Sequence, residues 1–194
     1  MFISHVPEGE ATGDVAEIYQ KEREWWGYLP NYAQLFSHRP AVLVAWRNLN
    51  ASIREGMDRR LYELATLSAA TTLHSSYCSL AHGKFLTEFY EPSQVVDVLG
   101  ARSTLPTREA MMMDFAVKVA GDASAITQAD VAALREAGFS DTDIFDVAAT
   151  AAARCFFAKL LDALGAQPDH QLNELDPNMV GVLTVGRPIA PAAT

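Results

Sequence analysis

Residues 63 to 83 read ELATLSAATTLHSSYCSLAHG, and this stretch decides the fold because it joins two helical patterns across a short polar turn. Just upstream, Asp58 is a suitable N-cap for a helix that continues to about residue 73 with apolar and small side chains on one stripe. Downstream, the hydroxyl groups of residues 74–77 suit the start of a second helix that runs until Pro92. We therefore predict two consecutive helices, with Cys78 in the first turn of the second.

Cys78 and His82 carry the chemistry that this stretch suggests. Because they are four residues apart, their side chains project about 40° apart on adjacent turns of one helix. A thiol in a first helical turn feels the positive end of the helix dipole, and a neighbouring imidazole accepts its proton, so both effects favour the reactive thiolate. Glu63 on the preceding helix would orient the imidazole or relay its proton. The spacing thus predicts a catalytic group of Cys78, His82 and Glu63.

Simpler interpretations of the same residues stay open at this stage. A Cys and a His four residues apart are usually packed or surface residues, and Glu63 suits a solvated first helical turn. Zinc binding by Cys78 and His82 would need further ligands, and the chain has no second Cys/His cluster. Cys155 lies in the most apolar segment, where a free cysteine usually packs as a small hydrophobic side chain.

The rest of the chain is helical by pattern. Apolar periodicity and capping residues predict helices over residues 12–26, 40–56, 93–99 and 141–164, and others starting at Thr107 and Thr127. The segment 141–164 is apolar on nearly every side, which predicts a buried central helix. No alternating run bounded by hairpin turns occurs, and only residues 180–185 have any β preference. We predict one all-α domain over residues 1–167 and an extended tail over residues 168–194 that lies across a neighbouring subunit.

Composition and charge restrict the class of protein. The formal net charge is −9, and no block of Lys or Arg provides the electrostatic footprint of a nucleic-acid-binding protein. No apolar run approaches the roughly 20 residues that span a bilayer, and the N-terminus lacks the pattern of a secretion signal. Two cysteines do not form a disulfide framework. We expect a cytoplasmic protein that binds neither nucleic acid nor membrane.

The spacing among Glu63, Ser75, Cys78 and His82 resembles the signature of the AhpD-like alkylhydroperoxidase and carboxymuconolactone decarboxylase superfamily. Its peroxidase pattern is Glu, eleven residues, Cys, two residues, Cys, three residues, His, and this chain has Glu63, Ser75, Cys78 and His82 at those positions. The segments GYLPN at 27–31 and EAGFSDTDI at 136–144 resemble the peroxidase-related branch. The resemblance covers roughly residues 27 to 165. It implies an AhpD-like helical bundle that assembles as a dimer, trimer or hexamer.

The resemblance also implies a reaction. In the family's two-cysteine members, one thiolate attacks the peroxide, becomes a sulfenic acid and condenses with the other cysteine. Ser75 cannot form that disulfide, so an antioxidant cycle through Cys78 needs Cys155, another subunit's cysteine or a small thiol as reductant. We expect Ser75 to cap its helix through its oxygen, and Tyr77 either to donate its hydroxyl into the site or to pack. The expected partners are a hydroperoxide and a thiol, with no cofactor and no metal.

Two other functions fit the same resemblance. A lyase similar to carboxymuconolactone decarboxylase would need proton transfer by His82 or Glu63 but no thiol, and the presence of Ser75 makes this more credible. A helical oligomer without turnover would bind a small ligand or a partner between its helices, and an unreactive Cys78 would favour it. The flanking segments favour the peroxidase.

Overall fold

The structure, a computed structural model, describes residues 1–100, 102 and 104–192 and contains no strand within them. The all-α prediction is therefore confirmed. The helices are α1 (Gly13–Trp26), α2 (Asn31–Leu35), α3 (Pro40–Glu55), α4 (Arg59–Thr72), α5 (Ser76–Leu86), α6 (Pro92–Gly100), α7 (Thr107–Asp122), α8 (Gln128–Glu136), α9 (Asp141–Ala163) and α10 (Pro177–Leu183). Short 3-10 turns lie at Glu8–Glu10, Phe36–His38, Ala123–Ala125 and His170–Glu174.

Helix starts follow the capping residues that the sequence shows. The carboxylate of Asp58 accepts the backbone N–H of Leu61 at 3.1 Å and so caps α4. Helices α8 and α9 both begin with a capping box, in which the side chain of Thr127 or Ser140 and the carboxylate three residues later bond each other's backbone N–H. These starts confirm the predicted boundaries, because local hydrogen bonds determine them.

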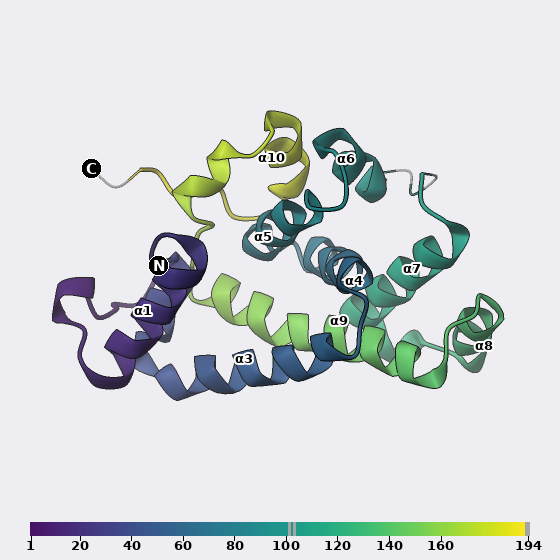
Figure 1. Cartoon of the computed structure of the whole chain (residues 1–194), viewed down its shortest axis with the longest axis horizontal. Coiled ribbons are helices and arrows are strands. Elements are labelled where there is room, and N and C mark those ends of the chain that lie inside the picture. The colour runs from purple at the N-terminus through teal and green to yellow at the C-terminus, as the bar shows by residue number, and fades with distance from the viewer. Residues whose placement is uncertain (101, 103, 193–194) are drawn as a thin grey trace.

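Helix α4 is the central helix, which corrects the prediction that the segment 141–164 would be buried on nearly every side. Every residue of α4 from Tyr62 to Ala70 is buried. Helix α9 lies against α3, α4 and α7, but Phe145 and Phe156 on its outer face are 69% and 47% exposed. Figure 1 shows α9 crossing the molecule between α3 and α4, with α5 beside α4. The core therefore surrounds the helix that carries Glu63.

Two further boundaries differ from the sequence prediction. Helix α2 was not predicted, because the sequence pattern predicts helices only over residues 12–26 and 40–56 in this part of the chain. Helix α5 ends at Leu86 instead of continuing to Pro92, because the N–H groups of residues 87 to 89 bond carbonyls three residues back and tighten the chain into a turn. The motif helix is thus short, and Cys78 and His82 lie in its first two turns.

The C-terminal segment folds back onto the core, so the expected extended conformation is wrong for residues 170–183. Asp176 caps α10 with its carboxylate, and Pro177 occupies the first helical position, where a missing N–H costs nothing. Met179 and Leu183 of α10 are fully buried, and α10 lies against α5 and α6. The weak β preference of residues 180–185 is therefore overridden by packing of an apolar helical face.

The same segment covers the start of α5. Ser79 donates its hydroxyl to the Leu183 carbonyl, and the N–H of Gly186 donates to the Ser76 hydroxyl at 2.7 Å. A Cβ atom at Gly186 would overlap the His74 carbonyl oxygen, so only glycine allows the chain this close. The tail thus closes the side of α5 on which its first serines lie.

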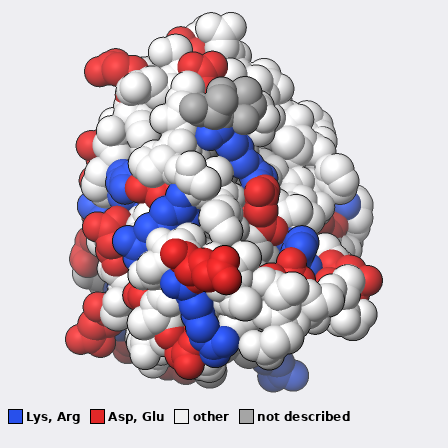
Figure 2. Space-filling model, turned by 90° about the vertical axis from the view of Figure 1, so that its right-hand side faces the viewer, with Lys and Arg blue, Asp and Glu red and all other residues white. Residues whose placement is uncertain are grey.

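The surface carries charges of both signs. Figure 2 views the molecule from the right-hand side of Figure 1 and shows Lys and Arg side chains interspersed with Asp and Glu, without a continuous basic area on that face. This pattern agrees with the lack of Lys and Arg blocks in the sequence. Among the described residues, every helix is too short or too polar to cross a lipid bilayer.

Candidate active site

Glu63, Cys78 and His82 come together beside one cavity of about 440 Å³. Cys78 occupies the third position of α5, as the sequence predicted, and His82 follows one turn later on the same helix. Glu63 projects from α4. All three side chains are buried, with exposed fractions of 2% for Glu63, 2% for Cys78 and 8% for His82. Burial and convergence on a cavity distinguish them from solvated or surface residues, so the surface interpretation of these three side chains is wrong.

Glu63 holds the imidazole of His82. Oε2 of Glu63 lies 2.5 Å from Nδ1 of His82. With a carboxylate as its partner, Nδ1 carries the proton, and Nε2 is left as the acceptor. Burial, and next the positive charge of Arg154, lower the pKa of His82 below its ordinary value of 6.5, while Glu63 opposes this shift. The imidazole is therefore neutral at neutral pH and able to accept a proton at Nε2.

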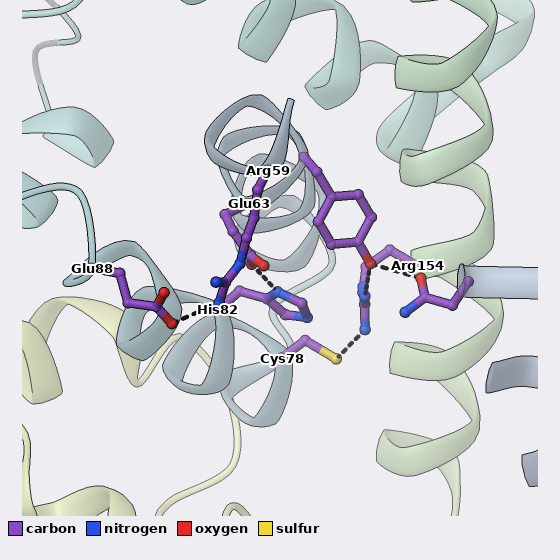
Figure 3. Close-up of polar contacts among 8 residues, drawn as sticks. Arg59, Glu63, Cys78, His82, Glu88 and Arg154 are labelled. Atoms are coloured by element: carbon purple, nitrogen blue, oxygen red, sulfur yellow. Dashed lines mark hydrogen bonds and ion pairs between the residues drawn. The ribbon is translucent and has the colours of Figure 1, made fainter. Parts of the chain in front are cut away.

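The sulfur of Cys78 contacts Arg154 of α9. Nη1 of Arg154 donates to Sγ of Cys78 at 3.8 Å, and within the described residues no hydrogen bond joins this sulfur to the His82 ring. Figure 3 shows the sulfur directed toward Arg154 and the imidazole directed toward Glu63. The expected direct contact between Cys78 and His82 is thus replaced by a contact between Cys78 and Arg154. A guanidinium stabilises a thiolate more reliably than an imidazole, because it is charged at every physiological pH.

A shell of polar and aromatic groups fixes the position of Arg154. Nη2 of Arg154 donates to the Tyr62 hydroxyl at 3.5 Å, and that hydroxyl donates to Oδ1 of Asn50 at 2.7 Å. The guanidinium also lies 5.5 Å from the ring centre of Trp46 and 5.8 Å from that of Phe157. Burial alone would lower the pKa of Arg154, but Cys78 and Tyr62 raise it overall. The cation is therefore retained in an apolar pocket.

The two supporting candidates, Ser75 and Tyr77, have different outcomes. Ser75 is the N-cap residue of α5 by position, but its side chain makes no capping hydrogen bond. The prediction that its oxygen caps the helix is therefore wrong. The Tyr77 hydroxyl donates to Oδ2 of Asp169 at 2.6 Å and accepts the Tyr32 N–H at 3.2 Å. Tyr77 also lines the cavity and packs in the hydrophobic core, which was the alternative expected for it. Tyr77 therefore links the motif helix to the tail.

Cys155 faces away from the site. It follows Arg154 in α9, so its side chain projects about 100° from the arginine that contacts Cys78. Its sulfur lies 3.4 Å from the Ala151 carbonyl oxygen and 3.9 Å from that of Ala120 in α7. Both cysteines are free. Packing of Cys155 against α7 agrees with the interpretation of this residue as a small hydrophobic side chain.

The cavity walls combine aromatic rings with basic side chains. The lining contains these aromatic residues: Trp25, Trp26, Tyr32, Trp46, Tyr62, Tyr77, Phe85 and Phe157. It also contains Lys21, Arg47, Arg54 and Arg154. In the described part of the chain, no group of three or more His, Cys, Asp or Glu residues is arranged to hold a metal ion. The arrangement suits a small organic molecule whose reactive atom reaches a sulfur, a neutral imidazole and a fixed cation.

Arg154 is the residue that sequence reasoning missed. It is 76 positions away from Cys78, so no local spacing connects the two. One signal was present: Arg154 is a single arginine in the middle of an otherwise apolar stretch of α9. An arginine is rarely buried without a specific partner, so an isolated one on an apolar helix indicates a paired or functional cation.

The sequence matches no protein-family model and no curated protein. Solved structures do match. An uncharacterized peroxidase-related protein from Ralstonia eutropha JMP134, described as an alkylhydroperoxidase AhpD core, is 24% identical with a TM-score of 0.73, over 94% of this chain and 96% of that chain. An uncharacterized peroxidase-related protein from Silicibacter sp. TM1040 is 22% identical with a TM-score of 0.77, over 88% of this chain and 93% of that chain.

A third similar structure has a named activity. It is a cysteine-to-alanine variant of the debrominase Bmp8 in complex with 2,3,4-tribromopyrrole, 14% identical with a TM-score of 0.73, over 94% of this chain and 96% of that chain. Identities this low establish a common fold, because one fold supports several chemistries. The resemblance inferred from the motif is thus confirmed in the architecture, and the chain has the AhpD-like helical fold.

Proposed function

We propose that this chain is a thiol-dependent hydroperoxidase that uses Cys78 as its nucleophile. One observation carries the proposal: a buried cysteine sulfur lies against a permanent cation, on the same cavity as a neutral histidine that a carboxylate holds in place. A charged neighbour and a proton acceptor are what an activated thiol requires. The AhpD-like fold of the peroxidase-related proteins agrees with this chemistry.

The first step is attack of the Cys78 thiolate on the terminal oxygen of a hydroperoxide. An S–O bond forms, the O–O bond breaks, and the products are a Cys78 sulfenic acid and an alkoxide. Arg154 stabilises the thiolate before attack. Its remaining N–H groups suit the negative charge that moves onto the leaving oxygen, as fixed donors do in other polar transition states.

His82 carries the proton in this scheme. Nε2 accepts the thiol proton when the thiolate forms and returns it to the leaving alkoxide, which becomes an alcohol. Glu63 stabilises the transient imidazolium of His82. Its carboxylate opposes the effects of burial and of the nearby Arg154, which both lower the pKa of His82. The sum of the step is one thiol and one hydroperoxide converted to one sulfenic acid and one alcohol.

The sulfenic acid must be reduced by a thiol from outside this site. Ser75 lacks a sulfur, and the Cys155 sulfur packs against carbonyl groups of α9 and α7. An external thiol condenses with the sulfenic acid to a mixed disulfide and water, and a second thiol releases Cys78 as the external disulfide forms. Two thiols therefore supply the two electrons that the hydroperoxide removes.

The test compares Cys78→Ser with Cys155→Ser, which are the same substitution at the two cysteines. Wild type and Cys155→Ser should couple loss of cumene hydroperoxide to oxidation of an added small thiol, and Cys78→Ser should not. Mass analysis with a sulfenic-acid trap should locate the adduct on Cys78. Equal turnover in wild type and Cys78→Ser would refute the proposal. Release of carbon dioxide from a candidate lactone that survives in Cys78→Ser but disappears in His82→Gln would instead indicate the lyase type of proton-transfer chemistry.

The aromatic lining and the likeness to a debrominase favour a second candidate, removal of bromine from a small aromatic ring. Such a reaction converts a C–Br bond to a C–H bond, releases bromide and oxidises two thiols to a disulfide. Incubation with 2,3,4-tribromopyrrole and a small thiol should then release bromide in a Cys78-dependent manner. The two activities are separated by comparing the rates with bromopyrrole and with hydroperoxide on one preparation.

A further inference from the structure

The charge inside the cavity has the opposite sign to the charge of the whole chain. The chain carries a formal net charge of −9. The cavity lining nevertheless contains Lys21, Arg47, Arg54 and Arg154, and its acidic residue is Glu63, which is bonded to His82. A cavity with low-dielectric walls concentrates the field of the charges that line it. A negatively charged ligand is therefore attracted into this cavity despite the overall repulsion.

Three of the four cations already have partners. Arg47 is paired with the buried carboxylate of Glu22. The Lys21 ammonium lies 4.0 Å from a Glu17 carboxylate oxygen, and Arg154 contacts Cys78 and Tyr62. Arg54 makes no ion pair with any described residue. It is thus the cation of the lining whose charge stays available to a ligand.

Arg54 is close to the chemical end of the cavity. It lies on α3 one turn after Asn50, which accepts the hydroxyl of Tyr62. Its positive charge also contributes to the lowered pKa of His82. Arg54 is exposed and lines the cavity, so it lies on the solvent side while His82 lies inside. A molecule bound between them can place one end at Arg54 and the other near the sulfur.

The inner part of the cavity offers an apolar surface. Rings of Trp26, Trp46 and Phe157 line it, and rings of this kind pack against aromatic or branched aliphatic groups. The cavity volume of about 440 Å³ falls in the range of small-molecule sites.

We infer that the cavity selects a hydroperoxide that carries a carboxylate on an aromatic or branched apolar body, with the carboxylate bound by Arg54 and the peroxide oxygens directed to Cys78 and Arg154. This inference rests on the proposed hydroperoxidase function and specifies its substrate class. A guanidinium and a carboxylate form paired, charge-assisted hydrogen bonds, which discriminate strongly against a neutral analogue.

The kinetic test uses two hydroperoxides that differ in one charged group. Cumene hydroperoxide and its 4-carboxy derivative react with wild type, Arg54→Gln, Arg54→Lys and Arg39→Gln. Arg39 precedes α3 and lies outside the cavity lining, so its substitution removes the same charge elsewhere. The readout is the ratio of the two values of kcat/KM, because a change in the pKa of His82 affects both substrates and cancels. Wild type should prefer the carboxylate about tenfold.

The preference should vanish in Arg54→Gln, persist in part in Arg54→Lys and be unchanged in Arg39→Gln. A ratio that does not change in Arg54→Gln, or that falls equally in Arg39→Gln, overturns the inference. A binding measurement separates this result from the chemistry. Quenching of tryptophan fluorescence, since Trp26 and Trp46 line the cavity, gives affinities for 4-isopropylbenzoate and for the neutral 4-isopropylbenzamide.

The binding result distinguishes the two proposals. Tighter binding of the benzoate that depends on Arg54, without oxidation of Cys78 by either hydroperoxide, supports the anion site and refutes the hydroperoxidase. Oxidation of Cys78 with equal affinity for benzoate and benzamide supports the hydroperoxidase and overturns the selection of anions. Absence of both effects overturns both.

Discussion

Substitution of Arg154 by glutamine is the sharpest test of how Cys78 is activated. The guanidinium nitrogen lies 3.8 Å from the sulfur and is buried with it. With an effective dielectric constant of about 20, a unit charge at that distance stabilises a thiolate by about 4 kcal/mol. Water or the new amide would recover part of this stabilisation. We therefore expect a loss of at least about 2 kcal/mol, which is half of the full value.

The expected change in reactivity follows from this loss. A loss of about 2 kcal/mol in the stabilisation of negative charge on the sulfur corresponds to about 30-fold in an equilibrium constant. A sulfur that holds its charge less stably is also a better nucleophile, with a Brønsted slope of about 0.4–0.5, so the alkylation rate falls by less than this factor. Alkylation of Cys78 by iodoacetamide at neutral pH should therefore slow about 6-fold, and about 40-fold if the full 4 kcal/mol is lost.

The assay follows Cys78 alkylation by mass analysis in Arg154→Gln, Arg154→Lys and Tyr62→Phe, with circular dichroism to verify folding. Arg154→Lys keeps the charge and should lose less than Arg154→Gln. Tyr62→Phe removes a hydrogen-bond partner of Arg154 but keeps the cation, so its rate should stay close to that of wild type. A folded Arg154→Gln protein that alkylates at the wild-type rate would refute electrostatic activation by this residue.

Three other changes probe the site and the tail. Glu63→Gln removes the charge that supports His82, so the pKa of His82 should fall further, as measured by NMR titration, and hydroperoxide turnover should drop about tenfold or more. Because burial first, and then Arg154, lower the pKa of His82, the folded state binds fewer protons than the unfolded state. The free energy of unfolding should therefore decrease as pH falls below the ordinary value of 6.5, and His82→Gln should weaken this dependence in urea titrations at several pH values. Leu183→Ala leaves a cavity between α10 and α5 and should cost about 2–5 kcal/mol in urea unfolding, whereas Val182→Ala on the exposed side of α10 should change little.

Local signals explain why most helices could be predicted from the sequence. The capping boxes at Thr127 and Ser140 and the cap at Asp58 are hydrogen bonds within four residues, so the sequence contains both partners. The tail shows the limit of this reasoning. Its prolines suggested an extended chain, yet Asp176 followed by Pro177 is also a helix start. The buried contacts of Leu183 with α5 decide between the two, and those contacts are not local.

The candidate site also has one part that local sequence signals could predict and one part that depends on non-local packing. The pattern of Glu63, Cys78 and His82 could be found because α4 and α5 are consecutive in the chain and pack against each other. Arg154 could not be placed by spacing, because its position depends on how α9 packs against α4 and α5. Sequence reasoning therefore proposed Cys78 and His82 as nucleophile and base, but it could not place Arg154 beside the sulfur.

The position of the tail has a consequence for the order of the proposed reaction. Serine side chains of α5 bind the segment from Leu183 to Gly186, so that side of the motif helix is covered by the chain itself. The Cys78 sulfur instead faces the cavity that α1, α3 and α9 line. Since no second cysteine shares this cavity, the hydroperoxide and the reducing thiol must occupy the same space in turn. The proposed cycle therefore requires ping-pong kinetics. It also requires a reductant small enough to enter a cavity of about 440 Å³. A bulky folded reductase would reach Cys78 only if the tail or α3 moved.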